Sequence, residues 1–420
     1  MNTLQKIKEK ILDNPKISTL ILFLSVMGPG LITATVDNDP GGILTYSLAG
    51  ANFGYELLWT FIPMALALIM AQEMGVRMGI ISGKGLASLI REKVGVKITL
   101  IIMIGLLIAN TGNTLAEFSG IVVSSSIFGL PKLIIVPLAA IFIWLLVIKG
   151  NYKTVEKVFI GASLIYLTYI VAGILAHPNW SQVAAGFTQP KIELNTAYIS
   201  MVVGLVGTTI APWMQFYLQS SVVEKGTSKD ELKYSRIESI IGPAFTCFVG
   251  LFILLACAAT IHTTGAQITN VQDVSTALLP VAGEYASLLF AIGFLNASLF
   301  SAVILPLSTA YYICESLGLE TGISKSFKEA PVFHGLYAGI ILLSAIIILL
   351  PGIPLMGILF FSQVANGVLL PVILILMLLI VNDKNIMGEY VNSKKYNIIA
   401  IIAVIIITLL VIIMLITSFI

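Results

Sequence analysis

The sequence contains little charge. Only 10% of its 420 residues are Asp, Glu, Lys or Arg, whereas 58% belong to the hydrophobic set. A soluble globular protein carries about 25% charged residues, so this composition excludes an ordinary soluble enzyme. The 23 basic and 21 acidic residues leave a net charge of +2, which does not point to nucleic acid. We therefore expect a lipid bilayer around the chain and no nucleic-acid partner.

Cysteine and histidine are also scarce. Cys247, Cys257 and Cys314 lie in apolar segments without the spacing of metal ligands or redox pairs, so we interpret them as packing residues. The three histidines do not pair at ligand spacing. Residues 82–85, Ser-Gly-Lys-Gly, lack the flanking glycine and hydroxyl of a phosphate-binding loop. We expect no cofactor, no nucleotide and no enzymatic activity.

Long apolar runs recur along the whole chain instead. A transmembrane helix needs about 20 mostly apolar residues, and this criterion predicts an all-α integral membrane protein with eleven spans. The predicted spans are 20–49, 55–74, 98–128, 131–149, 155–176, 198–220, 237–261, 281–313, 333–350, 354–381 and 397–419.

The few basic residues predict the orientation of these spans. Cytoplasmic loops of membrane proteins are enriched in Lys and Arg. If residues 1–19 form a cytoplasmic tail, 21 of the 23 basic residues lie inside and only Lys132 and Lys191 lie outside. We therefore expect a multi-pass protein of the plasma membrane with its N-terminus in the cytoplasm and its C-terminus outside the cell. Ten or twelve spans remain the alternative.

Two of the predicted spans are interrupted by helix-breaking residues. In the first span, residues 35–42 read Thr-Val-Asp-Asn-Asp-Pro-Gly-Gly, and in the sixth span residues 204–213 contain two glycines, two threonines and Pro212. Proline cannot donate a helical hydrogen bond, and glycine tolerates unwound backbone. We expect the first helix to split around Asp39, with a merely kinked helix as the alternative.

The placement of the two interruptions suggests an internal repeat. Broken helices at corresponding positions of two halves are typical of transporters built from inverted repeats. The prediction is five plus five helices, at 20–176 and 198–381, with helices 1 and 6 broken and an eleventh helix at 397–420. Unwound carbonyls and the C-terminal ends of half-helices bind cations in such proteins, and Asp39 is the acid best placed to supply negative charge.

The chain resembles the Nramp divalent metal transporters at several separate motifs. The matching residues are 28–31, 39–41, 49–55, 58–59, 115–117, 362–366 and 387–392. The resemblance implies a LeuT-type fold of eleven or twelve helices and proton-coupled uptake of Mn²⁺ or Fe²⁺. It also implies a metal site in which Asp39 is a side-chain ligand and the carbonyl of Thr208 is a backbone ligand.

The departures from the family pattern are informative. Gly42 stands where the family has a ligating Asn, and Ala211 stands where it has a ligating Met. Trp213 replaces a histidine, Gln219 is nearest to the place of a second histidine, and Thr114 replaces an acid. Two metal ligands and several candidate proton carriers are therefore absent together.

These losses favour a hard and hydrated ion. A thioether suits soft metals, whereas Mg²⁺ is usually held through one or two carboxylates and keeps several waters. The pattern resembles the Nramp-related magnesium transporters, which implies import of Mg²⁺ and Mn²⁺ by alternating access without proton coupling. The alternatives are an ordinary proton-coupled Mn²⁺ or Fe²⁺ importer, and a sodium-coupled carrier of organic solutes in which Asp39 binds an amine.

Further polar residues within the spans complete the candidate site. We expect Gln363 and Asn366 either to contact the ion or to hold helices together, and Glu117 either to line the path or to bond a neighbouring helix. Trp213 is expected in a cavity wall or in packing, and Asp37 in an outer vestibule or a structural pair. The predicted metal site thus comprises residues 39, 42, 208, 211, 363 and 366, and the predicted pathway residues are 37, 117 and 213.

Overall fold

The structure is a computed structural model that describes residues 29–149, 161, 163–279 and 283–418. Within these residues the chain forms helices and no strand. Nine helices in this part of the chain are long and apolar enough to cross a membrane. The prediction of an all-helical fold is therefore confirmed. The predicted tail at 1–19 lies outside the described residues, as do parts of the predicted spans at 20–49 and 155–176.

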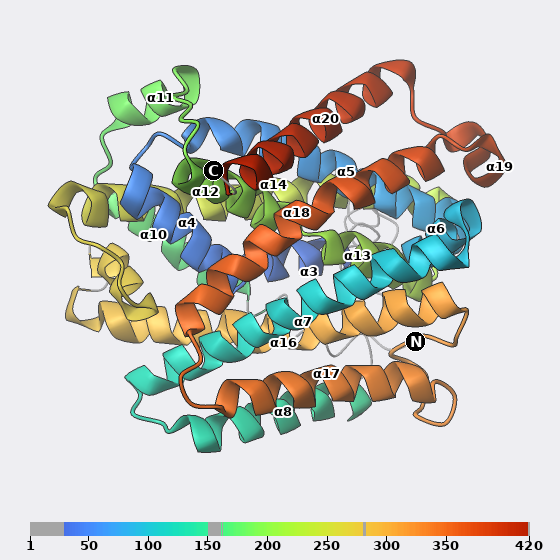
Figure 1. The fold of residues 1–420 in the computed structure, drawn as a ribbon, viewed down its shortest axis with the longest axis horizontal. Helices are drawn as coiled ribbons and strands as arrows, with labels where there is room; N and C mark the ends of the chain where they lie inside the picture. The colour runs from blue at the N-terminus through green and yellow to red at the C-terminus, as the bar shows by residue number, and fades with distance from the viewer. Residues whose placement is uncertain (1–28, 150–160, 162, 280–282, 419–420) are drawn as a thin grey trace, which may run out of the picture.

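The helices follow one another along nearly the whole described chain (Figure 1). In chain order the α-helices are α3 (Pro29–Val36), α4 (Pro40–Phe53), α5 (Phe61–Ser82), α6 (Leu86–Val94), α7 (Val96–Ile127), α8 (Lys132–Lys149), α10 (Leu167–Leu175), α11 (Trp180–Thr188), α12 (Thr196–Thr209), α13 (Pro212–Lys225), α14 (Leu232–Cys257), α16 (Ala286–Leu317), α17 (Pro331–Leu349), α18 (Leu355–Val381), α19 (Lys384–Met387) and α20 (Lys394–Thr417). Short 3₁₀ and π segments join them, including the π-helical turn η4 (Ala258–His262).

The second predicted span is shifted along the chain. We expected it at 55–74, but α5 runs from Phe61 to Ser82. It starts later because the turn that begins at Gly54, whose φ is 56°, extends to Leu57 and is followed by a 3₁₀ segment at Leu58–Thr60. It continues past Glu73 because the carboxylate of Glu73 pairs with the guanidinium of Arg77 one turn later, at 2.9 Å. The helices α6 and α11 were not predicted, since each has only nine residues.

The two interrupted helices lie in the centre of the molecule. The most apolar stretch of Thr196–Lys225, which spans α12 and α13, is 89% buried, whereas those of α8 and α20 are 22% and 28% buried. Figure 1 shows α3, α4, α12 and α13 in the middle, with α8 and α17 along one edge. The central helices therefore contact other helices on nearly every face, and the peripheral ones present apolar faces outward.

Glycines allow the central helices to approach one another closely. A Cβ atom on Gly207 of α12 would lie 2.1 Å from the carbonyl oxygen of Gln363 of α18. A Cβ atom on Gly120 of α7 would lie 2.8 Å from the ring of Pro40 at the start of α4. Small residues at helix crossings are typical of membrane proteins, where association depends on close packing. These contacts bring α7 and α18 against the two helix breaks.

Candidate functional site

The first helix break centres on three residues between α3 and α4. The helix α3 ends at Val36, and α4 begins at Pro40 with Asp39 as its N-cap. The Oδ1 atom of Asp39 accepts a hydrogen bond from the N–H of Gly42 at 2.6 Å, which is the usual way to satisfy a free donor at a helix start. Pro40 has no N–H, so the carbonyl of Val36 has no partner four residues ahead. The predicted break at Asp39 is confirmed.

The second break repeats this arrangement in the sixth predicted span. The helix α12 ends at Thr209 and α13 begins at Pro212, with Ile210 and Ala211 between them in non-helical conformations. Because Pro212 has no N–H, the carbonyl of Thr208 lacks a donor four residues ahead. The C-terminal ends of α3 and α12 therefore both lack a helical donor at the break and carry the negative end of a helix dipole, and at α3 the carbonyl of Val36 instead accepts a 3.4 Å hydrogen bond from Oγ of Ser301.

The two breaks meet at Gly42. A Cβ atom on Gly42 would lie 2.8 Å from Oγ1 of Thr208, 2.9 Å from the carbonyl oxygen of Asp37 and 3.3 Å from Oδ1 of Asp39. Three oxygen atoms from both breaks thus surround the position that the missing side chain leaves open. An asparagine at this position would require these oxygens to move. The structure therefore brings Asp39, Gly42 and Thr208 together, and the Thr208 atom nearest to Gly42 is Oγ1, not the carbonyl oxygen that was predicted as a ligand.

Acidic and polar groups without partners surround this position. Both carboxylate oxygens of Asp37, both amide atoms of Asn38 and Oγ1 of Thr208 are buried and make no hydrogen bond with the described residues. The carboxyl groups of Glu117 and Asp39 are near enough to interact. No Lys or Arg of the described chain pairs with any of the three acids. A buried charge without a partner is costly, so this cluster is suited to a cation.

The position of Asp37 differs from both predictions made for it. It is only 2% exposed, so it does not face an open vestibule, and it makes no structural pair among the described residues. Its side chain is buried in the same break as Asp39. The neighbouring Asn38 is equally buried and was not predicted. Its position within the Asp-Asn-Asp sequence of the break was the signal for it.

The side chain of Gln363 lies against the first turn of α4. A Cβ atom on Gly41 would lie 2.0 Å from Nε2 of Gln363. The Oε1 atom of Gln363 accepts a hydrogen bond from Nδ2 of Asn366 at 3.1 Å. Gln363 therefore lies beside Asp39, while Asn366 lies one hydrogen bond further away.

A chain of amides continues from Asn366 into α7. Asn113 donates to Oδ1 of Asn366 at 2.9 Å and to Oδ1 of Asn110 at 3.1 Å. Asn110 donates in turn to the carbonyl of Leu305 in α16 at 2.7 Å. Asn366 thus joins α18 to α7, which fits the prediction of a helix-holding role. Asn110 and Asn113 were not among the predicted site residues, although Asn113 lies one turn before Glu117 on the same face of α7.

The two remaining predicted residues are buried at the start of α13. Ala211 is its N-cap, and both Ala211 and Trp213 are 2% exposed. The carbonyl of Trp213 accepts a hydrogen bond from Oγ of Ser308 in α16 at 2.9 Å. The described residues contain no group of three or more His, Cys, Asp or Glu side chains that could hold a metal ion. Any metal at the breaks must therefore take most of its ligands from carbonyls, hydroxyls or water.

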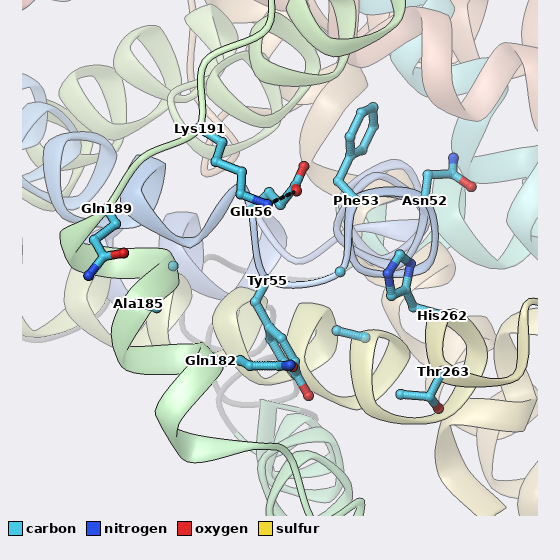
Figure 2. Close-up of a pocket in the computed structure, with 13 residues that line it drawn as sticks. Asn52, Phe53, Tyr55, Glu56, Gln182, Ala185, Gln189, Lys191, His262 and Thr263 are labelled. Carbon is cyan, nitrogen blue, oxygen red and sulfur yellow. Dashed lines mark hydrogen bonds and ion pairs between the residues drawn. The ribbon is translucent and has the colours of Figure 1, made fainter.

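A pocket of about 480 Å³ lies at the far end of α4. Figure 2 shows Lys191 and Glu56 paired on one side of it, at 3.0 Å, with His262 on another. His262 is fixed by a 2.9 Å hydrogen bond between its Nδ1 and the carbonyl of Ala51. The pocket begins at Asn52, thirteen residues along the chain from Asp39 and about 20 Å away at the rise of a helix. The site at the breaks is therefore enclosed and separate from this pocket.

A family comparison covers most of the chain. The family described as natural resistance-associated macrophage protein-like, or Nramp, matches residues 30–417. The chain is 28% identical over 392 residues to the divalent metal cation transporter MntH of Deinococcus radiodurans, covering 90% of this chain and 86% of that protein.

Solved structures give the same fold. The Eremococcus coleocola manganese transporter, in complex with an aromatic bis-isothiourea compound, matches with a TM-score of 0.76 and 22% identity over 92% of this chain and 85% of that one. MhsT in complex with L-phenylalanine matches with a TM-score of 0.57 and 15% identity, covering 93% and 98%. The expected likeness to Nramp and LeuT-type transporters is confirmed at the level of the fold.

A single methyl group at Gly42 tests the geometry of the breaks. Gly42→Ala places Cβ within 3 Å of two oxygens, which must shift, so we expect at least tenfold weaker Mn²⁺ binding and a lower unfolding temperature. Calorimetric titration and a melting curve measure both. Gly112→Ala is the matched control, because nothing lies within 4 Å of its Cβ position. Unchanged Mn²⁺ binding by Gly42→Ala would show that the ion does not lie between the breaks.

Proposed function

The chain belongs to the Nramp family, and from this premise we propose that it imports Mg²⁺, in largely hydrated form, and Mn²⁺ by alternating access without proton coupling. The observation behind this proposal is the meeting of the two breaks at Gly42, where Oδ1 of the buried Asp39, the carbonyl oxygen of Asp37 and Oγ1 of Thr208 lie close to one position. Free carbonyls at the ends of half-helices are typical cation ligands in transporters. The proteins of this family are transporters, so the buried acids belong to a transport site and not to a catalytic one.

The choice of ion follows from the ligands that are present. Ala211 and Gly42 contribute no side-chain donor, and Asp39 contributes a carboxylate. Thioethers select soft metals, whereas Mg²⁺ prefers oxygen and releases its water reluctantly. A site with one carboxylate ligand, carbonyls and few other protein ligands is therefore suited to an ion that keeps much of its water. Mn²⁺ also accepts oxygen ligands, and the named relatives carry divalent cations or manganese.

The absence of proton coupling is supported by the polar chain next to the site. Asn110, Asn113, Asn366 and Gln363 form consecutive hydrogen bonds between α16, α7 and α18. Amides neither gain nor lose protons at physiological pH, so these four hydrogen-bonded amide side chains do not form a series of titratable groups. The acids that lie near Asp39 are Asp37 and Glu117.

We also propose an orientation of the chain in the membrane. The N-terminus lies in the cytoplasm and the C-terminus outside the cell, across a plasma membrane crossed eleven times. Helices 1–5 and 6–10 form inverted repeats, which places the breaks of α3–α4 and α12–α13 at equivalent positions near the membrane midplane. The recurrence of a proline at the first position of α4 and of α13 supports this equivalence.

Uptake into proteoliposomes tests ion choice and coupling together. We expect both Mg²⁺ and Mn²⁺ to enter and millimolar Mg²⁺ to compete with Mn²⁺, while an internal pH dye shows no acidification. Asp39→Asn, which keeps the shape but removes the charge, serves as the inactive control. Mn²⁺ entry that is unaffected by Mg²⁺ and accompanied by internal acidification would instead identify an ordinary proton-coupled importer.

A thioether introduced at position 211 tests whether the softness of the ligands decides which metal ion is bound. In Ala211→Met, a sulfur is added at the N-cap of α13, so we expect at least tenfold tighter binding of Cd²⁺ with no gain for Mg²⁺. Ala211→Leu has nearly the same bulk without sulfur and serves as the control. If Met and Leu change Cd²⁺ affinity equally, position 211 does not face the ion.

A further inference from the structure

A groove between α18 and α20 is apolar along its length and polar at one end. Its volume is about 720 Å³, and it is separate from the ion site. The apolar walls are formed by Ile375, Leu378, Leu379, Ile401, Val404, Ile405 and Leu409. The polar end is formed by Lys93, Asn382, Asp383 and Asn397. Figure 1 shows α18 and α20 running beside each other, with α6 and α19 near the same end.

The length of the groove matches one leaflet of a membrane. Its lining on α20 extends from Asn397 to Leu409, a separation of twelve residues and about 18 Å at the rise of an α-helix. Half of a bilayer's hydrocarbon core is about 15 Å. The walls also face outward, since Leu379 and Ile405 are 49% and 52% exposed. The groove is thus long enough for the acyl chains of one lipid and open to receive them.

The polar end has an excess of positive charge. Lys93 and Asp383 form an ion pair at 2.6 Å and cancel each other. Lys394 and Lys395 are exposed in the first turn of α20, where no acid is present. Lys394 does not line the groove itself but lies one turn before Asn397 on α20, just beyond the polar end. Cations at the N-terminus of a helix oppose its dipole, and an anion bound there would relieve this conflict.

Asparagines complete the polar end. Nδ2 of Asn382 donates to Oδ1 of Asn397 at 2.8 Å. Nδ2 of Asn397 donates no hydrogen bond to the described residues, so it is free to donate to a phosphate oxygen. The polar end therefore places hydrogen-bond donors and nearby positive charge next to the apolar walls of the groove.

We propose that this groove binds an anionic phospholipid of the cytoplasmic leaflet, with its phosphate at Lys394 and Asn397 and its acyl chains along Ile401 and Ile405. The choice of leaflet depends on the orientation proposed above. Basic pockets between transmembrane helices on the cytoplasmic side bind acidic headgroups. A second copy of the chain fits less well, because two copies meeting here would bring their basic ends together or leave them uncompensated.

Native mass spectrometry of the purified protein tests the binding of lipid directly and does not depend on transport. Phosphatidylglycerol and phosphatidylcholine with identical acyl chains are supplied together. We expect one phosphatidylglycerol per chain, retained at least about fivefold over phosphatidylcholine. The double variant Lys394→Gln, Lys395→Gln should lose this preference, and Ile405→Trp should lose the bound lipid while keeping its thermal unfolding temperature.

A second groove in the same protein supplies the control. It has a volume of about 420 Å³ between α7 and α17, and none of its lining residues is charged. Leu343→Trp fills that groove and should leave phosphatidylglycerol binding unchanged. Equal retention of both lipids by the wild type, or unchanged binding by Ile405→Trp, would overturn the proposal.

Two further outcomes identify other occupants. Displacement of the lipid by glycerol phosphate without acyl chains would indicate a simple phosphate site and would contradict the proposal. Efficient disulfide cross-linking of Ile405→Cys in vesicles would show that a second copy covers the groove, which would contradict it as well. The cysteines at 247, 257 and 314 are buried, so they do not complicate this assay.

Discussion

The carboxylate of Asp39 is 4% exposed in the middle of an apolar helix bundle, and no basic residue of the described chain pairs with it. A charge in this position must be balanced by a proton, a cation or the local backbone. The chain balances it in part with the N–H of Gly42. That bond exists only because α4 starts at Pro40, so the helix break and the charge depend on each other.

The second break explains why the site is suited to a cation and not to a neutral group. Pro212 removes the helical donor to the carbonyl of Thr208 as Pro40 removes that to Val36, and at Gly42 the Oγ1 atom of Thr208 and the carbonyl oxygen of Asp37 come close to Asp39. Gly42 lets the two breaks approach closely, since even a Cβ atom there would lie 2.8 Å from Oγ1 of Thr208, and Ala211 adds no side-chain ligand. The residues at these two positions therefore leave oxygen atoms as the ligands on offer.

Much of this arrangement could be predicted from the sequence, because helix breaks in apolar segments are local features. Pro40, Gly41 and Pro212 are sufficient to locate both breaks, and Asp39 is the acid next to one of them. The contact between Gly42 and Thr208 and the hydrogen bonds between Asn113 and Asn366 could not be predicted from spacing, because they join residues far apart in the chain. The start of α5 was misplaced because the turn at Gly54 looks apolar in sequence.

The central claim is that a divalent ion binds between the two helix breaks through Asp39. Calorimetric titration of the purified protein with Mg²⁺ and with Mn²⁺, repeated on Asp39→Ala, tests it most directly. The account predicts one binding event for each ion in the wild type and loss of both in the variant, with the helical fold retained. Undiminished binding of either ion by Asp39→Ala would contradict the claim.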